Sequence, residues 1–116
     1  KDGEQMRDFL YVKDAVEMTL HFAEQATAAG GLYNLGSGEA NTWLTLTRAI
    51  FSALGREPAI DFVDMPEILR GKYQYFTQAD TSKLRATGYV RVMTPLAASV
   101  RDYVQNQLVT GKKLGE

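Results

Sequence analysis

Short runs of strand-forming residues alternate with longer amphipathic stretches along this chain. Met6–Val12 is rich in aromatic and branched side chains, which favours a β-strand. Asp14 and Glu17 then have the spacing of a capping box, and apolar residues recur after them at helical intervals. The pattern predicts a helix from about Asp14 to Ala29. Gly30–Gly31 would end it, because glycine readily adopts the positive φ of a helix terminus.

The alternation continues in the middle of the chain. Leu32–Leu35 predicts a short strand, and the turn after it leads into a second helix that Asn41 or Thr42 can cap and Gly55 ends. Ala59–Met65 is again rich in strand formers and is followed by a proline. It predicts a third strand, at a sheet edge.

The last part of the chain is mostly helical in pattern. Residues 66–71 predict at most one helical turn, and residues 72–77 are aromatic and irregular, which predicts a loop or extended segment. Asp80 can cap a short helix that runs to Thr87, and Thr94–Pro95 has the residue types that open a final helix. The order β-α-β-α-β-α-α predicts an α/β fold with a small mixed sheet and about four helices.

Length and charge limit the kinds of partner. With 116 residues the chain suits one domain, and we expect residues 1–116 to form a single unit. Thirteen basic and 14 acidic side chains give a net charge of −1, so we expect no nucleic-acid partner and no membrane partner. The sequence lacks a signal peptide and any long apolar run, which predicts a soluble, cytoplasmic protein. Because it opens without Met, we expect it to be a piece of a longer protein.

The residues needed for several chemistries are missing. The sequence has no Cys and one His, His21, so disulfides, thiol catalysis and Cys-His zinc sites are excluded, and we expect no metal site. His21 lies beside an apolar helix face and is expected to be structural. None of the six Tyr is followed four residues later by Lys, so the Tyr and Lys acid/base pair of short-chain nicotinamide enzymes is absent, and we expect no catalytic residue in this chain.

One glycine-rich turn has part of a dinucleotide-binding pattern. Gly36-Ser37-Gly38 follows a predicted strand and opens a predicted helix, as such a pattern requires. Asn41 stands where the third glycine should be, so the motif is incomplete. We therefore expect an ordinary turn and no cofactor binding, although a helix N-terminus there could help to hold an anion.

Two features leave a binding role open. Arg7 has the planar fork that suits a phosphate, but an Arg beside an Asp in a strand usually forms a surface or inter-strand salt bridge. Arg70–Phe76 combines two cations, an amide and three aromatic rings without helix or strand periodicity. Such a segment can bind phosphates and cover a base or sugar with its rings, or it can fold back onto the core.

Longer stretches are similar to a known family. Arg7–Asp14 and Tyr33–Gly38, in this order with a helix between them, resemble the C-terminal half of extended short-chain dehydrogenase/reductase enzymes that act on nucleotide sugars. Leu69–Asp80, followed by Lys83–Ala86 and Gly88–Tyr89, is similar to the signature region of the ADP-glycero-manno-heptose 6-epimerase family.

The resemblance carries functional implications. It implies that Arg7 and Tyr73 bind an ADP-sugar substrate, with Lys72 and Gln74 as further candidates. It also implies a homo-oligomeric, NADP-dependent isomerase that inverts the sixth carbon of the heptose by transient oxidation and re-reduction, in the synthesis of lipopolysaccharide core precursors. NADP would be bound by an N-terminal part absent here, so this chain alone is expected to be inactive. Another nucleotide-sugar epimerase or dehydratase, or a non-catalytic binding or interaction module, remains an alternative.

Overall fold

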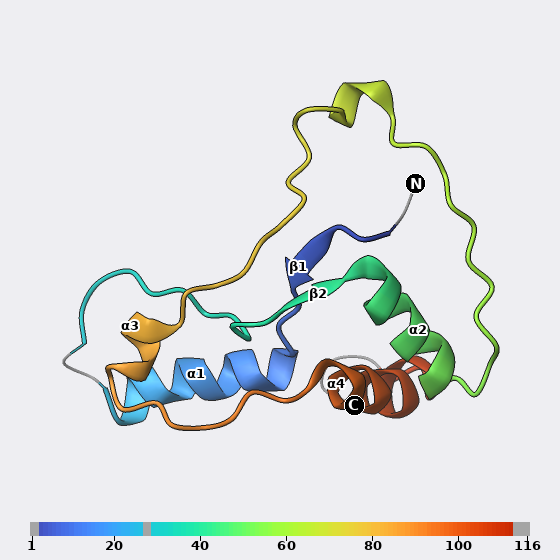
Figure 1. Ribbon diagram of the computed structural model, residues 1–116. Helices are drawn as coiled ribbons and strands as arrows, with labels where there is room; N and C mark the ends of the chain where they lie inside the picture. Colours follow the sequence, from blue (N-terminus) through green and yellow to red (C-terminus); the bar gives the residue numbers. More distant parts are fainter. Residues whose placement is uncertain (1–2, 27–28, 113–116) are drawn as a thin grey trace.

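The computed structural model describes residues 3–26 and 29–112 (Figure 1). These residues form four α-helices and one two-stranded sheet, together with one turn of 3-10 helix and a π-helical extension of the last helix. The elements are β1 (Met6–Asp8), α1 (Val12–Glu24), β2 (Ala40–Thr42), α2 (Trp43–Ala53), the 3-10 turn (Glu67–Leu69), α3 (Ser82–Arg85), α4 (Leu96–Tyr103) and the π-helix (Val104–Leu108).

The sheet is small and mixed, as predicted. β1 and β2 are antiparallel, with Arg7 opposite Asn41. On its other side β1 meets the segment around Phe76 in a parallel bridge, in which the Met6 N–H donates to the Tyr75 carbonyl (2.7 Å) and the Thr77 N–H donates to the Met6 carbonyl (3.1 Å). β1 therefore has a backbone neighbour on each edge.

The helices form near their predicted positions, but α1 ends at Glu24 and not near Ala29, so Gly30–Gly31 does not end it, and the predicted side-chain caps of α1 and α4 are wrong. α1 begins at Val12 without a side-chain cap, and Asp14 instead accepts hydrogen bonds from the backbone N–H and hydroxyl of Thr94, at 2.7 and 2.8 Å. Thr94 is thereby used to tie α1 to the start of α4, which has no side-chain cap either. The predicted cap of α2 is confirmed, because the Thr42 hydroxyl accepts from the Thr45 N–H.

Strands account for most of the other differences. The predicted strands Leu32–Leu35 and Ala59–Met65 are irregular, and no strand pairs with them within the described residues. Their apolar side chains lack cover: Leu32 is 87% exposed and Val63 is 79% exposed. Conversely β2 forms where the sequence predicted a helix start, because β1 provides it with a partner. The first strand ends at Asp8, four residues earlier than expected from Met6–Val12.

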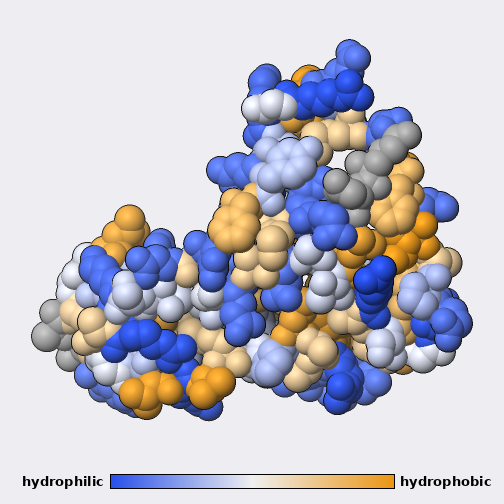
Figure 2. All heavy atoms as spheres, in the orientation of Figure 1, coloured by the Kyte–Doolittle hydropathy of each residue, from blue (hydrophilic) through white to orange (hydrophobic). Residues whose placement is uncertain are grey.

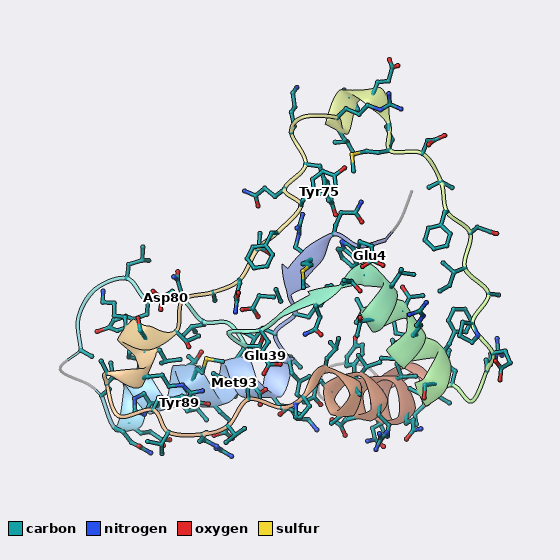
Figure 3. All side chains as sticks on the ribbon, in the orientation of Figure 1. Glu4, Glu39, Tyr75, Asp80, Tyr89 and Met93 are labelled. Carbon is teal, nitrogen blue, oxygen red and sulfur yellow. The ribbon has the colours of Figure 1, made fainter. Side chains whose placement is uncertain are left out.

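Two packed regions lie on either side of β1. In one, Met18 of α1, Leu84 of α3 and Tyr89 form a buried cluster. Tyr89 and Met93 belong to a segment that runs beside α1 (Figure 3). In the other, α2 packs against α4 (Figure 1). Long irregular segments loop out between them, so the Cα radius of gyration is 16.8 Å, whereas a compact chain of this length would have about 13 Å.

Candidate functional site

The candidate site is assembled across β1. On one edge of this strand, the antiparallel pairing continues beyond β2, since the Trp43 N–H donates to the Gln5 carbonyl at 3.2 Å. On the other edge, the backbone bonds of the parallel bridge hold the segment that contains Tyr73 and Tyr75. Trp43 and Tyr73, which are 30 positions apart in the sequence, are therefore brought to one place by the backbone of a three-residue strand.

Arg7 and Tyr73 lie together at this place. The Arg7 guanidinium carbon stands over the Tyr73 ring, 4.8 Å from its centroid, and one guanidinium N–H donates to the Met6 carbonyl at 2.8 Å. Both side chains are half-buried. No carboxylate pairs with Arg7 in residues 3–26 and 29–112, so the salt bridge with Asp8 that the sequence left open does not form. A partly desolvated cation on an aromatic face is thus available to an anion.

Further aromatic side chains surround Tyr73. The Trp43 indole N–H donates to the Tyr73 hydroxyl oxygen at 3.1 Å, and Phe9 meets the Trp43 ring edge to face, with centroids 5.0 Å apart. The Tyr75 ring stands nearly perpendicular to that of Tyr73, 6.2 Å away, on the segment that descends toward β1 in Figure 3. The Arg70–Phe76 cluster therefore folds partly against the sheet, while Tyr75 and Phe76 stay largely exposed.

Asp8 fills the glycine-rich turn. Its carboxylate accepts hydrogen bonds from the backbone N–H groups of Ser37 (2.7 Å), Gly38 (2.9 Å) and Ala79 (3.0 Å), and from the Ser37 hydroxyl (2.6 Å). Partial burial alone would raise the pKa of this carboxyl, but the hydrogen bonds from Ser37, Ala79 and Gly38 outweigh it and hold the pKa below its usual value. The anion at this turn is thus an internal side chain.

This arrangement tests whether the turn fits a dinucleotide. The N–H groups of Ser37 and Gly38 that would face a pyrophosphate are already bonded to Asp8. A Cβ at Gly36 would lie 2.3 Å from the Ala79 Cβ, so Gly36 serves the close approach of another segment of the same chain. The turn does not fit a nicotinamide cofactor, and it functions as a structural junction.

The remaining candidates lie outside this group. The side chains of Lys72 and Gln74 are exposed, and neither forms a hydrogen bond or ion pair with any residue that the structure describes. The Asp80 carboxylate accepts from the Ser82 N–H, but the N-cap of α3 is Thr81, so the predicted cap at Asp80 is wrong. The His21 ring is buried and lies 2.8 Å from the Thr87 hydroxyl, which agrees with a structural role.

Two surface cavities flank the site. One of about 340 Å³ is lined by Trp43 and Tyr73 together with the irregular segment of residues 60–66. The other, of about 470 Å³, has more polar walls, which include Glu39, Asn41 and Arg85. Of the predicted site residues, only Tyr73 lines the smaller cavity. Within the described ranges there is no group of three metal-binding side chains and no helix long and apolar enough to cross a membrane.

Sequence reasoning missed two members of the site. The sequence pattern points to no binding role for Trp43, and Tyr75 enters only as one of the three aromatic residues of Arg70–Phe76. The position of Trp43 directly after the capping Thr42 could have indicated its role. Thr42 pairs with Met6 of β1, so the next residue, Trp43, also lies beside β1. The sequence does not show that β2 pairs with β1, so the position of Trp43 beside β1 could not be predicted.

The chain is similar to known epimerases. Residues 1–36 match the NAD dependent epimerase/dehydratase family. The ADP-L-glycero-D-manno-heptose-6-epimerase of Nitratidesulfovibrio vulgaris (strain DP4) is 49% identical over 107 residues, which cover 92% of this chain and 33% of that protein. The enzyme of the same name from Fusobacterium nucleatum subsp. nucleatum is 43% identical over 114 residues, or 93% of this chain and 34% of that protein. The chain thus spans about a third of the length of these curated relatives.

A solved structure supports the fold assignment. The chain resembles an NAD dependent-NDP-hexosamine 5,6-dehydratase, TunA, involved in tunicamycin biosynthesis, with a TM-score of 0.68 over 99% of this chain and 35% of that one, at 20% identity. The predicted α/β fold class is thereby confirmed. Over nearly its whole length, the chain is thus similar to about one third of the length of two ADP-L-glycero-D-manno-heptose-6-epimerases.

Proposed function

We propose that this chain is the substrate-binding, C-terminal part of an ADP-heptose 6-epimerase, and that Arg7 and Tyr73 bind the nucleotide sugar. The observation that carries the proposal is the half-buried Arg7 guanidinium on the Tyr73 ring, for which the described residues provide no carboxylate partner. The names of the relatives support the same assignment.

The chemistry of a nucleoside diphosphate sugar suits this pair. The guanidinium offers a planar set of N–H donors that matches two phosphate oxygens, and within residues 3–26 and 29–112 it donates one hydrogen bond, to the Met6 carbonyl. The Tyr73 ring and hydroxyl can contact the ribose or the sugar beside the diphosphate. Lys72 and Gln74 are exposed on the same segment, and we assign them outer contacts with the ligand.

The catalytic residues and the cofactor site are assigned to the part of the enzyme outside this chain. Because Asp8 occupies the glycine-rich turn, NADP would be held by the N-terminal part, and this chain would contribute no catalytic residue. The whole enzyme would be a cytoplasmic homo-oligomer that makes lipopolysaccharide core precursors by inverting the sixth carbon of the heptose.

A chimera tests this proposal. This chain replaces the matching third of the Nitratidesulfovibrio vulgaris relative, and epimerisation of ADP-heptose is measured. We expect activity in the chimera, and a fall in kcat/KM of at least about tenfold for Arg7→Ala, which corresponds to about 1.4 kcal/mol of lost transition-state binding. Arg48→Ala removes an exposed arginine of α2 and serves as the matched control.

The outcomes separate the alternatives. Unchanged kinetics in Arg7→Ala would remove Arg7 from the site. Turnover of UDP-galactose in preference to ADP-heptose would assign the chain to another nucleotide-sugar epimerase. If the chimera folds and binds ADP-sugars but turns over none of them, the chain is a binding module without a catalytic partner of this kind.

A further inference from the structure

We propose that Trp43 is a positioning residue that presents the Tyr73 hydroxyl proton to the bound ligand. The inference rests on the proposed function, since it concerns the same pocket. It adds a residue that was not among the site candidates and states which direction the Tyr73 hydrogen bond must have.

The direction follows from the chemistry of the two groups. An indole N–H can only donate, so in the 3.1 Å contact the Tyr73 oxygen is the acceptor. A phenol oxygen that accepts one bond keeps its own proton for another. No other hydrogen bond of this hydroxyl is formed among residues 3–26 and 29–112, so its proton is free to bond to water or to a ligand. The bond from Trp43 also polarises the O–H and makes it a better donor.

Trp43 is well placed to hold this geometry. Trp43 is the first residue of α2, and its backbone N–H donates to the carbonyl of Gln5, which precedes β1. Its ring is supported by Phe9, at a centroid distance of 5.0 Å. Trp43 lies on the β2 edge of β1 and Tyr73 belongs to the segment on the other edge. The indole hydrogen bond therefore joins the two edges and holds the Tyr73 hydroxyl in place.

The ligand group is constrained as well. Arg7 lies over the Tyr73 ring and offers further N–H donors, so the guanidinium and the Tyr73 O–H together present several donors at one place. An acceptor-rich anion satisfies both at once, and a diphosphate oxygen is such a group.

The first experiment needs no ligand. Trp43 is the single tryptophan of the sequence, so the protein has one indole N–H resonance in a nitrogen-proton NMR spectrum. Tyr73→Phe keeps the ring but removes the acceptor, and we expect the indole resonance to shift. Tyr75→Phe makes the same chemical change two residues away and is expected to leave it in place. An unmoved resonance in Tyr73→Phe would overturn the inference.

The second experiment is a double-mutant cycle with ADP as the probe, measured by titration calorimetry on the whole chain. We expect Trp43→Phe to weaken binding about fivefold and Tyr73→Phe about tenfold. In the Tyr73→Phe background, Trp43→Phe should cost almost nothing more, because Trp43 acts through the hydroxyl. Equal losses in both backgrounds would overturn the inference.

The two experiments distinguish this inference from the function on which it rests. Additive losses in a protein that binds ADP would contradict the role of Trp43 and leave the binding site standing. A wild-type chain that releases no heat with ADP, even as the chimera, would contradict the site and the inference together. If Trp43→Phe fails to fold, the indole resonance of Tyr73→Phe still decides the geometry.

Discussion

The region of α1 and α3 is closed by its own side chains, whereas the region of α2 and α4 is open. In the first, Met18 and Leu84 are completely buried, and His21 packs its ring against Tyr89 with centroids 5.3 Å apart. In the second, an apolar cavity of about 400 Å³ remains between β1, α2 and α4. Its walls include Phe9, Leu46, Ile50, Val100, Val104 and Leu108. Hydrophobic surface is visible in both halves of the molecule (Figure 2).

The difference shows where burial stabilises this chain. Close packing around Leu84 provides both the transfer of apolar surface from water and the dispersion contacts of a filled interior. The same kind of side chain beside the cavity, such as Leu108, which is 58% exposed, gains only part of either. Truncating a buried side chain of the α1–α3 cluster should therefore cost more stability than the same truncation at an exposed wall of the cavity.

The largest effect is expected from truncating that core. Leu84→Ala should lower the free energy of unfolding by about 2–5 kcal/mol, because Leu84 has no exposed surface and its neighbours cannot fully close the space. The matched control is Leu108→Ala, which makes the same chemical change at the open cavity and should cost less than about 1 kcal/mol. Urea unfolding followed by circular dichroism measures both, and equal losses would contradict the comparison.

The closed region was also the more predictable one from sequence. Its helices depend on local periodicity, so α1 and the glycine stop after α3 could be predicted from the spacing of apolar residues and from Gly88, which has φ 93°. The strands depend on partners. Residues 32–35 and 59–65 have strand-forming composition but find no strand to pair with in the described ranges.

The candidate site shows the same limit. Arg7 and Tyr73 were proposed from residue type and resemblance, and both kinds of evidence lie in short stretches of sequence. Their juxtaposition, and the part played by Trp43, depend on β1 having neighbours on both edges, which no local pattern reports. The internal use of the glycine-rich turn by Asp8 likewise depends on a contact between residues 29 positions apart.

The junction between the two regions gives the next prediction. Gly36→Ala would place a Cβ 2.3 Å from the Ala79 Cβ and 2.8 Å from an Asp8 carboxylate oxygen, so one of the segments must move. We expect a loss of about 1–3 kcal/mol in the free energy of unfolding. Gly30→Ala is the control, since its Cβ would meet nothing within 4 Å and its φ is not positive. A loss of similar size in both variants would refute the close-approach explanation.

A smaller effect should follow the charge of Asp8 at the same junction. Its pKa is below the ordinary value of 3.8 in the folded chain, so its contribution to stability is complete above pH 3.8 and is lost as the pH falls through the lower, folded-state pKa. Asp80 and Asp102 shift in the same direction, so the wild type alone does not isolate Asp8. The difference in urea midpoint between wild type and Asp8→Asn should therefore shrink as the pH falls below 3.8, and a constant difference would contradict the role of the carboxylate.

The smallest effect concerns the surface contact between Lys13 of α1 and Asp102 of α4. Asp102 of α4 accepts hydrogen bonds from Lys13 (2.7 Å), Tyr11 and Asn106, and these bonds lower its pKa to about 2. Because the pair is exposed to solvent, its removal should hardly change the unfolding midpoint. The titration itself is the sensitive measurement. Carbon NMR of the Asp102 carboxyl should give a midpoint near pH 2, and Lys13→Met should raise it toward 3.8, since the largest of the lowering contacts is then gone. A midpoint that stays near 2 without Lys13 would contradict the role of this lysine and would leave Tyr11 and Asn106 as the groups that hold the carboxylate ionised.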